Sequence, residues 1–332
     1  MAIKKTLSFL LKNLIRVVLL IICVSIVAFA LISISPIDPL QVNVGPAALG
    51  SLSPEQIQKL EDYWGMNTPP LERYFAWASD FIQGDMGISL LYRRSVTSVI
   101  ADKMLNSLWL MAFAWTISGL FGFSLGVISG VKQGSLIDRI IKSYSMLLAS
   151  TPAFWLALLL LMIFAVWLGI LPVGLSVPIG MEASAVTLAD RLRHSVLPAL
   201  TLSITGISSI TLHTREKIID VMNSDYVLFA KARGEKTWGI VFRHGLRNIL
   251  LPAITLQFAS ISEIFGGSVL VEQVFSYPGL GQAAVTAGLG SDVPLLLAIT
   301  MISVIIVFLG NFIANILYGV IDPRIRRATV KS

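Results

Sequence analysis

Long apolar segments alternate with polar ones along this 332-residue chain, and they are longer than the core helices of soluble domains usually are. Six of them carry at most one Lys, Arg, Asp or Glu, and each is close to or above the ~20 residues that a helix needs to cross a bilayer. They are residues 17–34, 104–131, 143–171, 195–214, 249–271 and 293–321. The strict alternation typical of transmembrane β-strands is absent from these runs. The pattern therefore predicts an all-α, polytopic membrane protein with six transmembrane helices.

The composition supports this prediction. Hydrophobic residues make up 55% of the chain and charged residues only 13%, whereas a soluble domain carries about 25% charged residues. The mean hydropathy is +0.80. These values exclude a soluble globular protein and a disordered one. The single cysteine, Cys23, leaves no disulfide framework and no cysteine-based metal site.

The basic residues indicate the orientation of the spans. Of the 25 lysines and arginines, 18 lie before the first span, between spans two and three, between spans four and five, or after the sixth. Cationic loops stay in the cytoplasm, so both termini are expected there. The chain then divides into a cytoplasmic N-terminus with the first helix (residues 1–35), an extracytoplasmic helical insertion (36–103), a five-helix core (104–321) and a cytoplasmic tail (322–332). A cleaved signal peptide is the alternative for residues 17–34, but this apolar run is longer than the 7–15 residues usual for the apolar region of a signal peptide.

Two amphipathic helices are expected in the insertion. The first begins at Pro54, where Ser53 and Gln56 form a capping box, and ends at Gly65. The second begins near Pro70 and ends at Gly84. Its apolar stripe comprises Leu71, Tyr74, Phe75, Ala78, Phe81 and Ile82. The pair either packs on the outer mouth, lies in the headgroup region, or docks an external partner.

The cytoplasmic loop of residues 216–251 carries more apolar side chains than a solvated loop needs. Seven basic and four acidic residues lie between Arg215 and Arg247, and the apolar residues keep helical spacing. Such an element suggests a helix that inserts into a groove of a partner protein. A helix lying on anionic headgroups is the alternative.

Motifs for chemistry within this chain are absent. The sequence has no GxxxxGK[ST] loop, no HExxH and no GxSxG. His194 and His244 flank spans, and His213 is expected to cap the end of the fourth span rather than to bind a metal. No enzymatic activity, bound cofactor, metal or nucleic acid is therefore expected. Energy for transport would come from a partner chain or from an ion gradient.

Glu263 is the one acid inside a predicted span. A carboxylate at such a position faces a cavity or the interior of the bundle by default, because its exposure to lipid is costly. Two interpretations remain open: a buried acid bonded to a neighbouring helix, and a side chain that lines the transport pathway.

Six motifs in order resemble a known family, the ABC importer permeases of the dipeptide, oligopeptide and nickel branch ("B"-type). In the cytoplasmic loop, Asp225-Tyr226-Val227 and Ala230-Lys231-Ala232-Arg233-Gly234 are followed by Arg243-His244-Gly245-Leu246-Arg247-Asn248, which resembles the EAA-type coupling region. The other five motifs are residues 35–39, 84–89, 195–199, 271–281 and 322–326. One departure is Ile37, which stands where the family usually has glycine.

The resemblance implies an importer built from this chain, a homologous second permease subunit and two ATPase subunits that hold ATP and magnesium. An extracytoplasmic substrate-binding protein would deliver the cargo, and the chain would lie in the cytoplasmic membrane of a prokaryote. A short coupling helix centred on residues 230–234 would contact the ATPase, and Gly234 would suit a tight turn after it. Arg243, His244, Arg247 and Asn248 would complete this coupling site together with Asp225. Glu272, Phe275, Pro278 and Gly279 would form an outer gate or docking site.

The resemblance leaves the cargo open between peptides and nickel or metal chelates. Nickel-type members are similar to this chain in having an acid where Glu263 stands, and an acid would suit a cationic cargo. Two other classes remain as alternatives. An ion-coupled secondary transporter would show internal repeats with broken helices, and an intramembrane enzyme would need paired catalytic groups at one depth.

Overall fold

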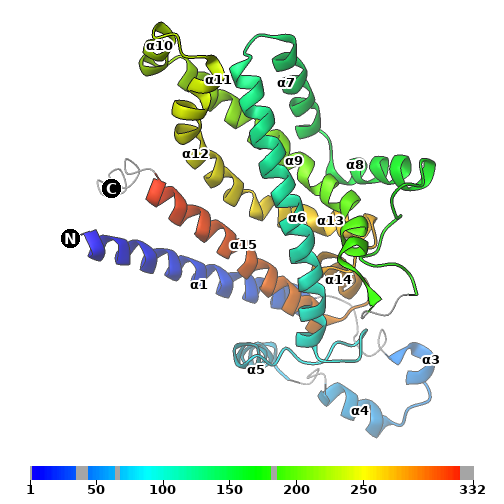
Figure 1. Ribbon diagram of the computed structural model, residues 1–332. Helices are drawn as coiled ribbons and strands as arrows, with labels where there is room; N and C mark the ends of the chain where they lie inside the picture. Colours follow the sequence, from blue (N-terminus) through cyan, green and yellow to red (C-terminus); the bar gives the residue numbers. More distant parts are fainter. Residues whose placement is uncertain (1, 35–43, 64–67, 181–184, 322–332) are drawn as a thin grey trace. The chain divides into compact units, whose positions relative to one another are not determined.

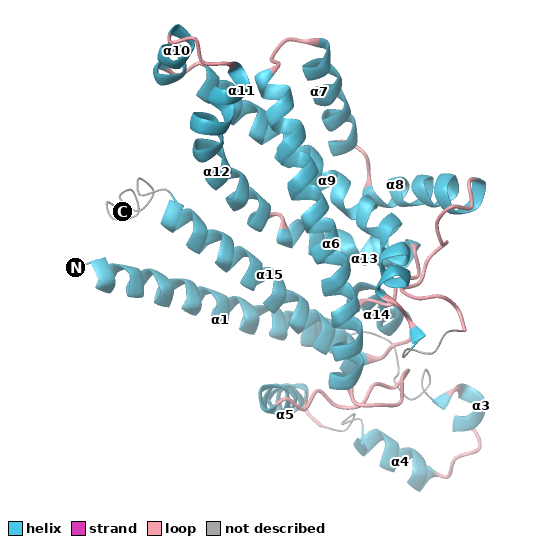
Figure 2. Ribbon diagram, in the orientation of Figure 1, coloured by secondary structure: helices cyan, strands magenta, loops and turns pink. Residues whose placement is uncertain are grey.

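The computed structural model describes residues 2–34, 44–63, 68–180 and 185–321, and the regular structure in these ranges is helical apart from one isolated β-bridge between Ile88 and Ser95 (Figure 2). The helices are α1 (Ala2–Ile34), α3 (Pro46–Leu49), α4 (Pro54–Tyr63), α5 (Pro70–Gln83), α6 (Val96–Val131), α7 (Leu136–Ala149), α8 (Ala153–Leu160), α9 (Leu188–Met222), α10 (Asp225–Ala232), α11 (Thr237–Ile240), α12 (Leu246–Ala259), α13 (Ile261–Val274), α14 (Leu280–Leu289) and α15 (Val293–Ile321), with π-helical segments η1 (Leu161–Trp167) and η3 (Val241–Gly245) (Figure 1). The all-α prediction is confirmed. The predicted stop at Gly65 and the motifs at residues 35–39 and 322–326 lie outside the described residues.

Four of these helices, α1, α6, α9 and α15, are individually long and apolar enough to cross a membrane. Two further candidates are helix pairs bent at a short break: α7 with α8 and η1, bent by 108°, and α12 with α13, bent by 42°. Counting each pair as one span gives the six that the hydrophobic pattern predicts.

The third predicted span is not the single straight helix that its uncharged sequence suggested. The helix stops at Ala149 and restarts at Ala153. Pro152 explains the break, because proline lacks an N–H and disfavours helical geometry at the residue before it. The segment also ends at Trp167 rather than near Leu171. The fourth span is longer than predicted, since α9 continues to Met222, so His213 lies inside the helix and does not cap it.

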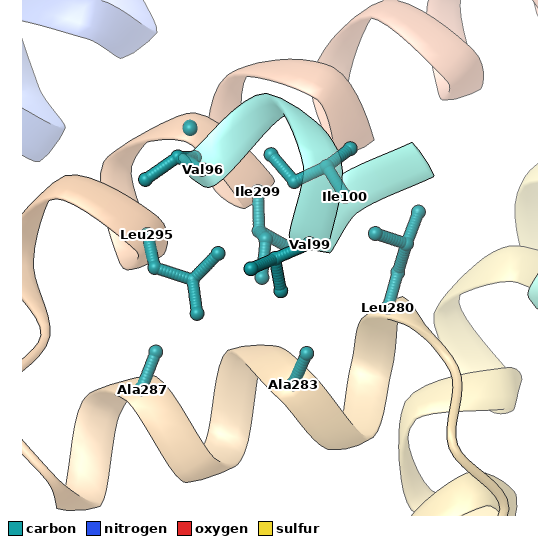
Figure 3. Packing of buried hydrophobic residues seen from close by; sticks show 9 residues of the cluster. Val96, Val99, Ile100, Leu280, Ala283, Ala287, Leu295 and Ile299 are labelled. Atoms are coloured by element: carbon teal, nitrogen blue, oxygen red, sulfur yellow. The ribbon is translucent and has the colours of Figure 1, made fainter. Parts of the chain in front are cut away.

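The chain forms two compact units, each considered by itself: residues 1–105 with 279–308, and residues 106–278 with 309–332. The core of the first unit brings the start of α6 together with α14 and the start of α15 (Figure 3). Ala283 and Ala287 of α14 present small side chains to Val99 and Leu295 (Figure 3). Next to this core, the buried carboxylate of Asp292 accepts hydrogen bonds from the Ser89 hydroxyl and from the backbone N–H of Leu91.

Both helices predicted in the insertion are present. Ser53 and Gln56 exchange the two hydrogen bonds of a capping box at the start of α4, with lengths of 2.9 and 3.3 Å. Gly84 ends α5 in the left-handed conformation, with φ of 88°. The local capping signals therefore predicted the described ends of these helices correctly.

In the second unit, α6 and α9 pack at close range along a row of glycines. A Cβ atom added at Gly122, Gly126 or Gly130 would lie 2.6–2.9 Å from a side-chain atom of α9. Carbon atoms in ordinary contact are about 3.5–4.0 Å apart, so only glycine allows this approach. The interface is the small-residue packing that membrane helices use in place of a hydrophobic driving force.

Candidate functional site

The candidate coupling site is the loop that follows α9 (Figure 1). Ser224 precedes the first residue of α10, and Asp225 places an acid in its first turn, where the helix dipole favours it. The helix ends at Ala232, and Gly234 then turns the chain with φ of 81°. The N–H of Glu235 returns to the carbonyl of Ala230 at 3.2 Å, which closes the turn. The loop therefore contains a short helix followed by a glycine turn, but the helix lies earlier than the expected centre at residues 230–234 and ends before Arg233.

The inner face of α10 is packed. Val227 and Ala230 are buried against Ile240, and Val221 and Met222 at the end of α9 contact the same cluster. This small core packs α10 against the end of α9 and against α11.

Two hydrogen bonds tie the loop to α12, and one further polar contact lies within the loop. The amide of Asn248 donates to the hydroxyl of Tyr226 at 2.9 Å and to the carbonyl of His244 at 3.0 Å. The imidazole Nε2 of His244 lies 3.5 Å from a carboxylate oxygen of Glu235. Asn248 therefore contacts α10 through Tyr226, whereas His244 contacts the turn that follows α10. Arg247 lies in the first turn of α12.

The outer face of the loop is apolar and exposed. We call this set of side chains the loop surface: Tyr226, Leu228, Phe229, Trp238 and Phe242. The guanidinium of Arg233 lies 6.0 Å from the ring centroid of Phe229, and Lys231 and Arg243 are also exposed. An exposed apolar patch with a charged rim is typical of a protein–protein contact.

A buried ion pair supports α9 before it enters this loop. The guanidinium of Arg215 makes two hydrogen bonds to the carboxylate of Asp138 in α7, at 2.6 and 2.8 Å. The Ser129 hydroxyl and the N–H of Gly134 donate to the same carboxylate at 2.6 and 2.8 Å. The sequence did not single out this pair, because both residues counted only as charges near a predicted cytoplasmic surface.

The two acids of α13 have different surroundings. Glu263 is exposed on the described chain, rather than buried against a neighbouring helix of it. Glu272 is fully buried, and its carboxylate accepts a hydrogen bond of 2.6 Å from Ser107. The sequence placed Glu272 just outside the span and therefore missed that α13 carries two acids.

The predicted outer gate is a packed turn. Glu272, Phe275 and Gly279 are buried, and Pro278 is half-buried. The carbonyl of Phe275 accepts from the N–H of Leu175 at 3.0 Å, and a Cβ atom added at Gly174 would collide with the same carbonyl. The buried side chains at this turn hold two loops together and offer few atoms to an external protein.

No cluster of three or more histidine, cysteine, aspartate or glutamate side chains that could hold a metal ion occurs among the described residues. The Nδ1 atom of His194 lies 2.8 Å from the carbonyl of Gly174, and His194 lies inside α9 rather than before it.

Comparisons with known proteins match nearly the whole chain. Residues 122–327 match the family described as binding-protein-dependent transport system inner membrane component, and residues 6–105 match the N-terminal region of such membrane components. The oligopeptide transport system permease protein AppB of Bacillus subtilis is 33% identical over 321 residues, which cover 96% of this chain and 99% of AppB. The glutathione transport system permease protein GsiC of Escherichia coli K12 is 31% identical over 322 residues, which cover 96% and 99%. A putative peptide permease protein of Brucella suis is 33% identical over 310 residues, which cover 92% and 95%.

Proposed function

Because the chain belongs to the family of inner-membrane components of binding-protein-dependent transport systems, we propose that it is the permease subunit of an ATP-driven importer of short peptides. It is a multi-pass membrane protein and a transport component rather than an enzyme. A system of this kind includes an ATPase and a binding protein as partners. We propose further that a homologous second permease completes the membrane part, and that two ATPase subunits hold all of the ATP and magnesium.

The orientation proposed for the chain has both termini in the cytoplasm of a prokaryote. The observation that supports it is the position of 18 of the 25 basic residues in the segments that would then face the cytoplasm. The loop surface would lie on that same side, within reach of the ATPases.

The observation that carries the coupling proposal is the two-sided character of α10. Its inner side chains are buried against α9 and α11, whereas Leu228 and Phe229 are 55% and 66% exposed. An apolar helix face on a structured loop fits the groove of a partner protein. A helix lying on headgroups is the alternative, and it would leave ATPase retention unchanged when the exposed side chains of α10 are replaced.

The mechanism that follows is alternating access. Closure of the ATPases would push α10, and α9 and α12 would move with it because of the shared packing and the Tyr226–Asn248 hydrogen bond. The spans would then rock as rigid bodies between outward-open and inward-open states. Dependence on a binding protein favours this scheme over an ion-coupled secondary transporter.

The coupling proposal is tested by removing apolar surface without touching the core. We expect the double substitution Leu228→Ser and Phe229→Ser to reduce both retention of the ATPase subunits on the tagged permease and ATP-driven uptake in proteoliposomes. Leu289→Ser removes a similarly exposed leucine outside the loop, and it is the control for ATPase retention. Normal ATPase retention and uptake in the double variant would refute the coupling role of this surface.

The peptide cargo is proposed from the relatives, whose names specify oligopeptides, peptides and glutathione. We propose that Glu263 lines the pathway and meets the cationic end of the peptide, since an exposed acid in a span is unfavourable against lipid. Glu263→Gln should lower uptake of a dipeptide with a free amino terminus more than uptake of its N-acetylated form. Equal effects on both peptides would leave Glu263 with a structural role, and uptake of a nickel chelate but of neither peptide would overturn the peptide assignment.

A further inference from the structure

Helix α5 has an apolar face that the rest of the described chain leaves uncovered. Leu71, Phe75 and Ile82 are 69%, 63% and 84% exposed. Together with Ala78 they recur at positions i, i+4, i+7 and i+11, so they form one continuous stripe along the helix. We call these four residues the α5 stripe.

A second face of α5 is packed against α1, in the same compact unit. The hydroxyls of Tyr74 and Ser25 are 2.8 Å apart. The rings of Tyr74 and Trp77 have centroids 5.4 and 5.9 Å from that of Phe29. These contacts determine which part of α1 the helix α5 lies against.

That part is the end of the membrane-spanning stretch. The uncharged apolar run of α1 is residues 17–34, so Ile34 marks the end of the predicted span. At about 1.5 Å per residue, Ser25 lies about 14 Å inside this end and Phe29 about 8 Å inside it. Closer to the end, Arg73 donates to Ser33 at 3.1 Å. Helix α5 therefore lies against the last turns of the span, and its contacts with Phe29 and Ser33 fall within the outer ~10 Å in which interfacial helices are immersed.

Helix α5 has three faces: the exposed α5 stripe, the face that packs on α1, and a polar side. This arrangement suits a helix that lies at a membrane interface. At about 100° per residue, the α5 stripe lies about a quarter-turn from the face that packs on α1. The polar side chains of Glu72, Asp80 and Gln83 occupy the side away from both apolar faces. Tyr74 and Trp77 are the aromatic types enriched at membrane interfaces.

We propose that the α5 stripe is immersed in the lipid leaflet at the C-terminal end of the α1 span, so that α5 anchors the insertion to the bilayer surface. The exposed surface of the span is continuous with this position, because Ile26, Leu31 and Ile34 of α1 are exposed beside the residues that contact α5. Helix α5 carries two acids and one arginine. Burial of its apolar side chains, rather than attraction to anionic lipid, therefore attaches it to the bilayer. The N-terminal insertion is thereby positioned by the membrane.

The test uses nitroxide labels on the assembled transporter in nanodiscs of phosphatidylethanolamine and phosphatidylglycerol. Cys23→Ser removes the native cysteine, and this parent, treated with the same label, supplies the background from partner subunits. Phe75→Cys and Ile82→Cys place labels on the stripe, and Asp80→Cys and Gln83→Cys are the matched controls on the polar face. We expect the stripe labels to collide several-fold more with oxygen than with a water-soluble nickel chelate, and the control labels to show the opposite preference.

Three outcomes would overturn the proposal. Stripe labels as accessible to the nickel chelate as the control labels would place the stripe in water. Low collision rates with both reagents would show that a protein, such as the second permease, covers it. Protection of the stripe labels from the chelate only after addition of the binding protein would instead identify a docking surface.

Discussion

Replacing Gly126 by alanine should weaken the packing of α6 against α9. The added Cβ atom would lie 2.6 Å from the Cβ atom of Thr214 and 2.7 Å from the carbonyl oxygen of Thr211. The carbonyl belongs to the backbone of α9, so a change of rotamer cannot relieve this contact. The two helices must move apart by several tenths of an ångström or more, and neighbouring contacts then lose part of their dispersion energy.

The magnitude follows from a comparison with a second glycine in a span. Gly266 in α13 has no heavy atom within 4 Å of its added Cβ atom, so Gly266→Ala is the matched control. Both substitutions gain the ~1 kcal/mol of helix propensity that separates alanine from glycine. Only Gly126→Ala incurs the overpacking penalty, so we expect it to be less stable than the control by about 1–3 kcal/mol.

The assay is thermal unfolding of the purified complex in detergent, monitored as loss of the monodisperse peak in size-exclusion chromatography. The two single variants are compared at equal concentrations of lipid and detergent. Gly122→Ala, with its nearest contact at 2.9 Å, should fall between Gly126→Ala and the control. If Gly126→Ala is as stable as Gly266→Ala, α6 and α9 do not pack at the distance on which this reasoning depends.

Substitutions at three further positions test the turn after α10 and two buried polar contacts. Asp138→Asn should destabilise the complex by roughly 3–5 kcal/mol in thermal unfolding, because it leaves Arg215 largely buried without its charged partner; a melting temperature equal to the parent's would contradict this. Gly234→Ala should reduce retention of the ATPase in a pull-down, since a φ of 81° costs a residue with a Cβ atom about 1–2 kcal/mol. Gly234→Asn should retain the ATPase, because asparagine adopts this conformation more readily. Equal retention in both variants would show that the left-handed turn at this position is not needed for ATPase binding. Glu272→Ala should cost about 1–3 kcal/mol in thermal unfolding because the buried Ser107 hydroxyl loses an acceptor, whereas Glu272→Gln keeps an oxygen there; equal stability of the two would argue against this role.

The sequence predicted those parts of the fold that depend on local physics. The length of a membrane-spanning segment is set by the bilayer, so uninterrupted apolar runs located the candidate spans. The start of α4 and the end of α5 followed from Ser53, Gln56 and Gly84, because capping is a contact between near neighbours. The break before Pro152 also has a local signal, the proline itself, although no charged residue interrupts the apolar run in which it lies.

Features that depend on distant residues were not predicted. Helix α14 was not predicted, because its residues were counted only as the connection between spans five and six; its alanines favour a helix, and contacts with α6 and α15 bury it. The partners Asp138 and Arg215 are 77 positions apart, and no spacing rule connects them. Glu263 and Glu272 lie on one helix of similar hydrophobicity throughout, so only the packing determines which of them is buried.

The glycine row and the ion pair belong to one register between α6 and α9. The last glycine of the row, Gly130, lies against the backbone carbonyl of Arg215, and its neighbour Ser129 donates to the carboxylate that Arg215 binds. A shift of α9 by one turn, about 5.4 Å along its axis, would carry the guanidinium beyond reach of Asp138. The ion pair can therefore form only in the register that the glycines permit. Since α9 continues without interruption to the cluster that holds α10, the register between α6 and α9 also sets the position of the loop surface.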